Sequence, residues 1–319
     1  MKKTDETKKQ KLLEELGKMS NKELMDELAD MQELASLILP RKKNYPKLPN
    51  LDYYVGTNPY QGLVAGDLPI IINFNEFNLE KKIEKAIGEG NVKLADTLKL
   101  NYDRFGVLIA DVRGHNMSAS IMLMHLYAAV KMAISYDLEL HGQATRGFLE
   151  KYNTFYYNLI NGVNMKQRPY MTLIYAEFLN DGRIRIIRAG HPAMVVFSNK
   201  NNRIEKLADQ YTAGSTIVGL MPSRFHADME HFEPAFATKE EYPVPEVHLQ
   251  GQGDIVVMYS DGLSEQDGGA RNFVAEGLEP LLQKHKHERA KTIYHTIMDA
   301  LPKYNPDDDV TIAVVKRKI

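Results

Sequence analysis

The sequence predicts an α+β fold in which strands and helices form separate layers. Short strand-like segments follow one another along much of the chain, and two of them meet at Asn180-Asp181-Gly182, where Asp-Gly is a strong hairpin signal. Apolar repeats at helical spacing come in blocks and do not alternate regularly with the strands. This arrangement favours an α+β layered fold over a doubly wound parallel sheet.

The expected elements cover most of the chain. Strands are expected at 53–57, 69–74, 104–112, 170–179, 183–189, 193–198, 254–260 and 310–316. Helices are expected at 118–136, 143–161, 273–285 and 288–301, and the apolar residues of the first are expected to be core. The stretches 78–102 and 221–252 are interpreted as elaborations between core strands, the second of them as loop.

The composition excludes several classes of function. The 319 residues include 40 basic and 42 acidic ones, for a net charge of -2, so bulk electrostatics does not indicate binding to nucleic acid or to an anionic membrane. There is no cysteine, which excludes disulfides, thiolate zinc sites and cysteine nucleophiles. The lysine-rich start is not followed by an apolar signal segment, and no uninterrupted apolar run is long enough to cross a bilayer, so a cytoplasmic location is expected.

The first forty residues are expected to form a helical segment. Ser20 followed by Glu23 is a capping-box pattern. Beyond it, apolar residues repeat at intervals of four and three over about two heptads, at Leu24, Leu28, Met31, Ala35 and Ile38. Such a helix can pack on its own domain, or it can bind a second copy or a partner. A proline-rich linker follows, so the sequence divides into residues 1–40 and a main domain, 41–319.

Four aspartates stand at the ends of predicted strands, at Asp67, Asp111, Asp261 and Asp308. An Asp-Gly turn alone explains any one of them. Four together, at widely separated points in the chain, indicate a shared site. Two carboxylates about 4 Å apart repel by roughly 4 kcal/mol at an effective dielectric near 20, so such a site needs a cation.

The ligand type indicates which cation the site would hold. Carboxylate oxygens suit Mg²⁺ or Mn²⁺ far better than a soft metal. Two such ions can activate a bridging water for attack on a phosphoryl group. That chemistry needs no protein nucleophile, which agrees with the absence of cysteine.

Six short motifs occur in an order that resembles a known family. They are Gln32…Leu39-Pro40, Ala65-Gly66-Asp67, Asp111-Val112-Arg113-Gly114-His115-Asn116, Thr172-Leu173…Ala189-Gly190-His191-Pro192, Gly253-Asp254…Ser260-Asp261-Gly262 and Asp308-Asp309-Val310-Thr311. The chain resembles the metal-dependent protein phosphatase (PPM, protein phosphatase 2C-like) family, in particular its bacterial SpoIIE/RsbU branch. The resemblance runs from about residue 30 to the C-terminus.

The resemblance implies a fold and a set of metal ligands. The fold would be a four-layer αββα arrangement, a central antiparallel β-sandwich flanked by helices. Asp111 would bridge two Mn²⁺ or Mg²⁺ ions, and the Val112 carbonyl would add a ligand. Asp67 would bind the first ion, while Asp261 and Asp308 would hold the second. Asp309 would support these ligands without binding metal.

The motifs also depart from the family pattern. Leu68-Pro69-Ile70 replaces a sequence that usually contains a second acidic residue, and Ser260 stands where the branch usually has threonine. Arg113 and Asn116 replace small residues beside the central aspartate. Arg113 could bind a substrate phosphate, but pairing with a neighbouring carboxylate, or exposure to solvent, is the more common arrangement.

Two histidines of the motifs invite a catalytic interpretation. A histidine could act as general acid to the leaving oxygen of the substrate. His115 and His191 both sit in Gly-His turns, where structural hydrogen bonding is the more common role. His115 is the better candidate of the two for a place near the site.

The resemblance implies a protein serine/threonine phosphatase whose substrate is a phosphorylated STAS-domain (anti-anti-sigma-like) regulator in a partner-switching pathway. Residues 1–40 would then form a homodimer or receive an activating protein. Two alternatives are a catalytically weak scaffold of the same fold, acting through its N-terminal helix, and a metal-dependent phosphohydrolase for small molecules. A scaffold has no need for four mutually repelling carboxylates, which favours the enzyme.

Overall fold

The computed structural model describes most of the chain. The described residues are 20–41, 45–60, 65–113, 117–161, 168–207, 215–224, 238–248 and 250–319. They belong to two compact units, Met1–Ile38 and Leu39–Ile319. The regulatory role of the first part stays a prediction.

The N-terminal unit contains α2 (Asn21–Ser36). The Ser20 hydroxyl accepts a hydrogen bond from the Glu23 backbone N–H at 3.2 Å, and the Glu23 carboxylate accepts one from the Ser20 backbone N–H at 2.8 Å. This reciprocal pair is the predicted capping box, because each side chain satisfies an N–H group that has no partner inside the helix. The helix predicted before it lies outside the described residues.

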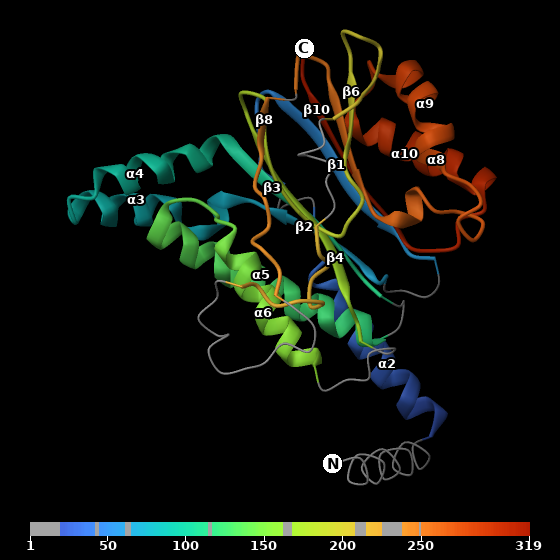
Figure 1. Ribbon diagram of the computed structural model, residues 1–319, viewed down its shortest axis with the longest axis horizontal. Coiled ribbons are helices and arrows are strands. Elements are labelled where there is room, and N and C mark those ends of the chain that lie inside the picture. The colour runs from blue at the N-terminus through green and yellow to red at the C-terminus, as the bar shows by residue number, and fades with distance from the viewer. Residues whose placement is uncertain are drawn as a thin grey trace. The chain divides into compact units, whose positions relative to one another are not determined.

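The second unit is built on two five-stranded antiparallel sheets (Figure 1). The first sheet has the order β1 (Leu51–Asn58), β10 (Val310–Arg317), β9 (Ile255–Tyr259), β6 (Val195–Ser198) and β7 (Arg203–Glu205). The second sheet has the order β2 (Asp67–Ile72), β3 (Arg104–Val112), β4 (Met171–Leu179), β5 (Arg183–Ala189) and β8 (Glu246–His248).

Alternation along the strands creates two hydrophobic layers. Val256 and Met258 of β9 belong to the cluster that also contains Val107 and Ile109 of β3, so this cluster lies between the two sheets. The intervening Val257 belongs to a second cluster on the outer face of the first sheet. Successive side chains of a strand point to opposite faces, so one apolar strand contributes side chains to both hydrophobic layers.

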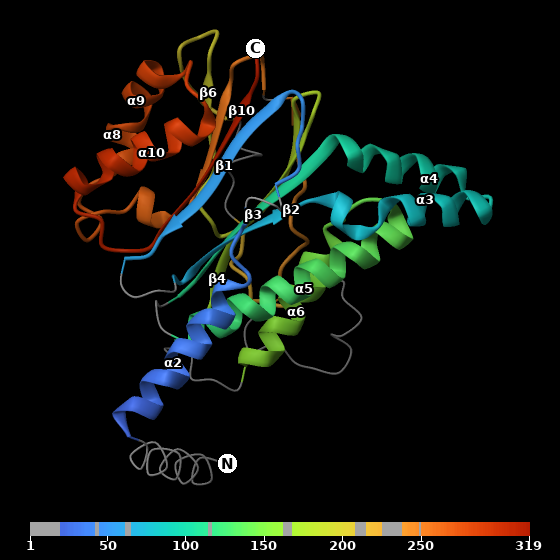
Figure 2. The same cartoon turned by 180° about the vertical axis from the view of Figure 1, so that it is seen from behind.

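Helices cover both outer faces of the sandwich (Figures 1 and 2). The outer cluster of the first sheet is completed by α8 (Phe273–Glu276), α9 (Leu278–His285) and α10 (Ala290–Ala300). On the second sheet, α5 (Met117–His141) packs against β2 and β3, and α6 (Gly147–Ile160) packs against α5. The four-layer αββα arrangement is therefore the one that the sequence predicted.

One helix of the sandwich has the composition of a membrane span. Within the described residues, the segment Ala119–His141 of α5 is long and apolar enough to cross a bilayer by length and composition alone. Core helices of soluble proteins pass the same test. Its contacts with β2 and β3 give it a packing role in this fold.

Several predicted boundaries were wrong. Phe74 does not extend β2 but opens the 3₁₀ helix η2 (Phe74–Phe77), because the Asn73 side chain accepts a hydrogen bond from the Asn75 N–H at 3.2 Å and turns the chain. The helix predicted at 273–285 breaks at Gly277 into α8 and α9. The stretch 221–252 is not all loop, since it contains β8.

The stretch 78–102 forms an antiparallel pair of helices, α3 (Leu79–Gly88) and α4 (Val92–Lys99), followed by the 3₁₀ helix η3 (Leu100–Asp103). Figure 1 shows this hairpin projecting from the second sheet. It ends directly before β3, so it borders the start of the strand that carries Asp111.

Candidate active site

A cavity of about 330 Å³ opens where the ends of several strands meet. Its lining comes from the ends of β2 and β3, the start of β4, and the turns that follow β9 and precede β10: Gly66, Asp111, Val112, Arg113, Tyr170, Thr172, Ile217, Asp261, Asp308 and Asp309. Three of the four predicted aspartates and Val112 therefore share one cavity.

The fourth aspartate, Asp67, lies beside this cavity without lining it. It is the first residue of β2 and pairs in register with Asp111 of β3. Directly opposed residues of antiparallel strands have Cβ atoms about 4.5–5.5 Å apart. Asp67 is buried, and Asp111 is the member of the pair that reaches the cavity.

Asp261 and Asp308 come from the first sheet. Asp261 opens η6 (Asp261–Leu263) directly after β9 and Ser260, and Asp308 stands two residues before β10. Gly262 allows these two segments to meet, because a Cβ atom on it would overlap the backbone carbonyl oxygen of Asp309. The Asp-Gly pair in this motif therefore serves a close approach between neighbouring segments as well as a turn.

Ser260 links the two sheets beneath the site. Its fully buried hydroxyl donates a hydrogen bond to Asp67 Oδ2 at 2.6 Å and accepts one from the Thr311 backbone N–H at 2.9 Å. Sequence reasoning did not assign Ser260 a role. The signal was available, since a hydroxyl residue stands between an apolar strand and Asp261 in this motif.

Asp309 holds the chain segment that leads into β2. Its two carboxylate oxygens accept hydrogen bonds from the backbone N–H groups of Tyr60, at 2.8 Å, and Gly66, at 2.5 Å. Both oxygens are thus engaged with backbone groups of the segment before Asp67. Asp309 also lines the cavity, and its supporting role stays a prediction.

Burial and mutual repulsion raise the pKa values of these carboxyl groups. Burial, with added repulsion from Asp261 and Asp308, raises the pKa of Asp111 to about 8. Burial, followed by the charge of Asp111, raises the pKa of Asp67 well above its ordinary value. Burial and the charge of Asp308 raise the pKa of Asp261 to about 6. Bound cations would stabilise the ionised forms of all three.

The donor set fits hard divalent cations in type and charge. Carboxylates and a backbone carbonyl are the ligands that Mg²⁺ and Mn²⁺ prefer. In the described part of the chain, however, no group of three or more His, Asp or Glu side chains is arranged closely enough to hold an ion. The ligand roles of Asp67, Asp111, Val112, Asp261 and Asp308 therefore stay a prediction.

The remaining residues of the motifs fall into three groups. Arg113 lines the cavity, and its side chain is exposed. Its backbone N–H donates a hydrogen bond to the Tyr170 carbonyl at 2.9 Å. His191 is buried and does not line the cavity, and its Nδ1 lies 2.8 Å from the Thr172 hydroxyl. Burial lowers the pKa of His191 to about 3, so it is neutral at pH 7. His115 and Asn116 lie outside the described residues.

Comparison with known proteins identifies the family. A model of the Stage II sporulation protein E (SpoIIE) family matches residues 101–318. The phosphoserine phosphatase RsbU of Bacillus subtilis (strain 168) is 22% identical over 271 residues, which cover 80% of this chain and 71% of RsbU.

Solved structures show the same fold. The SiaA-PP2C domain of Pseudomonas aeruginosa has a TM-score of 0.60 and 16% identity, over 93% of this chain and 98% of that one. The RsbU and RsbW domains of a Mycobacterium tuberculosis protein have a TM-score of 0.58 and 17% identity, over 88% of this chain and 64% of that one. RsbX in complex with magnesium has a TM-score of 0.50 and 12% identity, over 85% of this chain and 98% of that one.

The family match covers well over half of the chain, and its span contains Asp111, Asp261 and Asp308. The sandwich, with its helices on both faces, is the fold of the solved relatives. The chain belongs to the SpoIIE family of protein phosphatase 2C-like phosphatases.

Proposed function

We propose that this chain is a metal-dependent protein serine/threonine phosphatase that uses two ions of Mn²⁺ or Mg²⁺. The observation that carries the proposal is the cavity in which Asp111 of one sheet meets Asp261 and Asp308 of the other. Carboxylates that share a cavity repel one another, and this repulsion destabilises their ionised forms. Bound cations remove the repulsion, so cation binding explains why these carboxylates lie together. RsbX, which shares the fold, was crystallised in complex with magnesium, and this supports the choice of cation.

The bound ions would supply an activated water and charge neutralisation for an attack on the phosphoryl group. The chain's own part is to place the ligands. Asp111 and the Val112 carbonyl approach from the end of β3, Asp261 and Asp308 approach from the first sheet, and Ser260 and Asp309 orient the segments around Asp67. Arg113 would bind the phosphate at the wall of the cavity.

We further propose that the substrate is a phosphorylated STAS-domain regulator. The cavity volume of about 330 Å³ suits a phosphorylated side chain, with the body of the substrate remaining outside. The likeness to RsbU, a phosphoserine phosphatase, supports phosphoserine as the group that is hydrolysed.

The test is hydrolysis of a phosphoserine-bearing STAS protein with Mn²⁺, with and without a chelator. Wild-type protein should release phosphate only with the metal, and Asp111→Asn should abolish release. Asp307→Asn is a matched control, because Asp307 is exposed and lies outside the cavity. Cation-dependent release by Asp111→Asn would overturn the proposal, and faster turnover of nucleotides or sugar phosphates would refute the substrate assignment.

The N-terminal unit is proposed as a regulatory element. We propose that residues 12–39 mediate homodimerisation or receive an activating partner, because apolar residues repeat there at heptad-like spacing over about two heptads. Deleting residues 1–39 should change the oligomeric mass in solution or the phosphatase rate. If neither changes, the segment has no regulatory role.

A further inference from the structure

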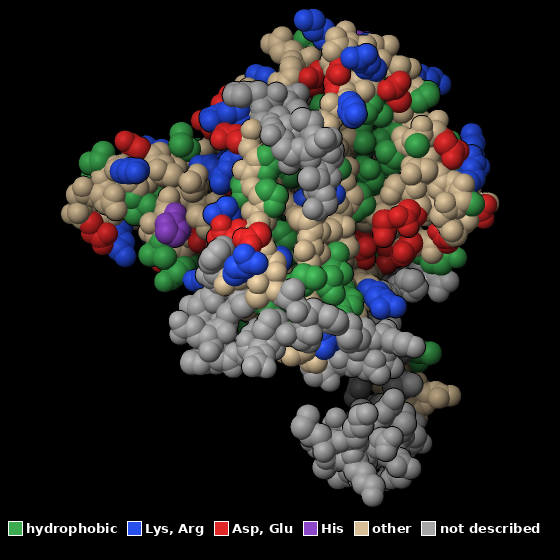
Figure 3. Space-filling view, in the orientation of Figure 1, with side chains coloured by type: hydrophobic (Ala, Val, Ile, Leu, Met, Phe, Trp, Pro, Cys, Tyr) green, Lys and Arg blue, Asp and Glu red, His purple; other side chains and the backbone are tan. Residues whose placement is uncertain are grey.

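A second, larger cavity of about 750 Å³ lies at the other end of the second sheet. Its walls come from η3 and the start of β3, the segment before α6, the β4–β5 turn with β5, and β8: Asn50, Leu100, Asp103, Arg104, Gln143, Thr145, Arg146, Leu179, Asn180, Asp181, Arg183, Arg185, Val244 and Glu246. None of these residues lines the aspartate cavity. Figure 3 shows basic and acidic side chains together in the recess between the α3–α4 hairpin and the sheet.

This cavity is remote from the proposed catalytic centre. Arg104 is the first residue of β3, and Asp111 lies seven residues further along the same strand. At about 3.4 Å per residue, the two Cα atoms are roughly 24 Å apart. An occupant of the second cavity would therefore not touch the metal-binding aspartates.

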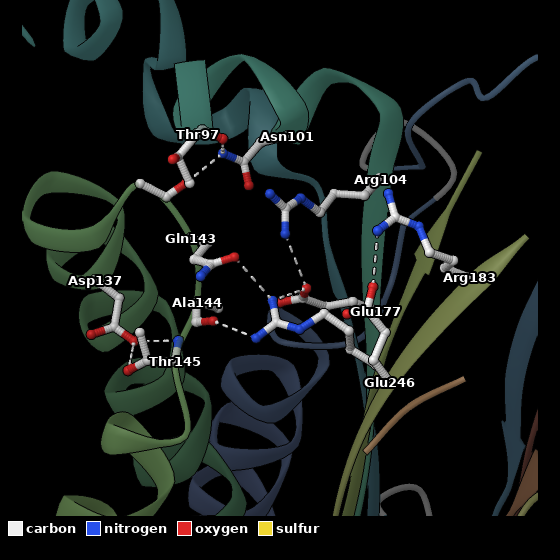
Figure 4. Close-up of polar contacts among 12 residues, drawn as sticks. Thr97, Asn101, Arg104, Asp137, Gln143, Ala144, Thr145, Glu177, Arg183 and Glu246 are labelled. Atoms are coloured by element: carbon white, nitrogen blue, oxygen red, sulfur yellow. Dashed lines mark hydrogen bonds and ion pairs between the residues drawn. The ribbon is translucent and has the colours of Figure 1, made fainter. Parts of the chain in front are cut away.

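Two arginines in this cavity share a single carboxylate. Arg104 Nη1 lies 3.3 Å from Glu177 Oε2, and Arg185 Nη1 lies 2.9 Å from the same oxygen. The other oxygen, Oε1, accepts a hydrogen bond from the Tyr175 hydroxyl at 2.9 Å. Figure 4 shows the Arg104 guanidinium group directed at Glu177. One buried negative charge opposes two positive ones, so a positive charge is left over.

The more deeply buried arginine also has an unused donor. The Arg104 side chain is only 3% exposed, and its Nε has no hydrogen-bond partner in the described part of the chain. Buried polar groups nearly always have a partner, so this unpaired donor is an exception within the buried group. Arg185 is more accessible and additionally reaches Gln143 Oε1 at 3.4 Å.

The other charged groups of the cavity include more carboxylates than arginines. Arg183 contacts two carboxylates, Asp181 at 2.8 Å and Glu246 at 3.1 Å. Arg146 pairs with Glu241. Asp103 is exposed and forms no ion pair within the described residues. Among these charges, the positive ones exceed the negative ones only within the buried group of Arg104, Arg185 and Glu177.

We propose that this cavity binds a small organic anion whose phosphate or carboxylate oxygens accept hydrogen bonds from Arg104 and Arg185. A guanidinium group matches both oxyanions in geometry. The lining has few apolar residues, and the volume suits a ligand up to the size of a nucleotide. The site is separate from the phosphatase centre, so it does not depend on the proposed function.

The test is calorimetric titration of the full chain after its metals have been removed with a chelator and dialysed away. The probes are inorganic phosphate, AMP and succinate, which separate phosphate from carboxylate recognition. Without metal, the aspartate cavity is negatively charged and should repel all three. Wild-type protein should bind at least one probe.

Variants assign the binding to this cavity. Arg185→Gln and Arg104→Lys should each weaken binding at least about tenfold, as expected for the loss of one charge-assisted hydrogen bond. Arg183→Gln is the matched control, since Arg183 lines the same cavity but is already neutralised, and it should bind within about twofold of wild type. Arg185 is partly exposed, so its variant should fold even if the change at Arg104 disturbs the buried pair.

Three outcomes would overturn the proposal. The first is that folded wild-type protein binds none of the probes. The second is that Arg183→Gln weakens binding as much as Arg185→Gln does, which would mean diffuse attraction to a basic surface. The third is that Arg185→Gln leaves binding intact, which would place the anion elsewhere.

Discussion

Replacing Ser260 with alanine removes one hydroxyl that serves both sheets. In the native protein this hydroxyl donates to Asp67 Oδ2 at 2.6 Å and accepts from the Thr311 N–H at 2.9 Å. Both contacts are buried, so water cannot easily replace them. The variant therefore leaves one buried carboxylate oxygen and one buried N–H group without their partner.

The size of the effect follows from these two losses. A hydrogen bond to a charged group contributes about 1.5–3 kcal/mol, and an unpaired buried N–H costs about 1–3 kcal/mol. We expect the free energy of unfolding to fall by about 3–5 kcal/mol, and the melting temperature by roughly 5–15 °C for a domain of this size. Because Asp67 also loses an orienting contact, the Mn²⁺ affinity should fall about 10–100-fold.

The measurements are thermal unfolding with saturating Mn²⁺ and the Mn²⁺ dependence of phosphate release. Ser260→Thr is the control, because it keeps the hydroxyl and is the residue usual in this branch of the family. It should retain more stability and more metal affinity than Ser260→Ala. If Ser260→Ala melts at the wild-type temperature and needs no additional Mn²⁺, the link between the sheets does not support Asp67 and the reasoning fails.

Three further predictions concern residues around the site. Asp309→Ala removes a buried hydrogen bond from the Gly66 N–H and a partly buried one from the Tyr60 N–H, and should lower the free energy of unfolding by about 3 kcal/mol in chemical denaturation. Asp307 is exposed, and Asp307→Ala should cost less than about 1 kcal/mol. Gly262→Ala places a Cβ against the Asp309 carbonyl and should cost about 1–3 kcal/mol and slow phosphate release, while Gly88→Ala, in open space, should do neither. Burial, reinforced by the charge of Arg188, lowers the pKa of His191 to about 3 from an unfolded value near 6.5, so the folded state binds fewer protons and stability is lost as the pH falls below 6.5. His191 should account for about 2 kcal/mol of the decrease in the free energy of unfolding between pH 7 and pH 5. If His191→Asn shows as large a decrease as the wild-type protein over this range, the assignment is wrong.

Much of the fold was readable from local patterns. The apolar strands and the Asp-Gly hairpin at residues 180–182 have the expected positions. A strand buried on one face shows alternation of apolar and polar residues, and a strand buried on both faces shows a continuous apolar run. The edge strands β7 and β8 were not predicted. Each has three residues and is defined by pairing with a neighbour, β8 with β5 and β7 with β6, and no local sequence signal encodes such a pairing.

The candidate site also has residues that the sequence predicted and contacts that it did not predict. The aspartates that end the strands could be named from the sequence, since a short motif marks each of them. The motif shows a hydroxyl residue before Asp261, but its hydrogen bond to Asp67 could not be predicted, because that contact joins residues 193 positions apart. The Arg104–Glu177–Arg185 group has no motif at all, and it exists because β3, β4 and β5 are neighbours in one sheet.

The sequence by itself determined the layered α+β class, the exclusion of cysteine chemistry, the family resemblance and the identity of the acidic residues, since all of these depend on composition and local spacing. Only the tertiary structure decided that Asp111, Asp261 and Asp308 share a cavity, that Asp67 lies beside it, and that two arginines of a second cavity share one buried carboxylate. The physical reason is that electrostatic interaction and burial depend on distances in space, and these distances are set by which strands pair and which sheet faces pack together.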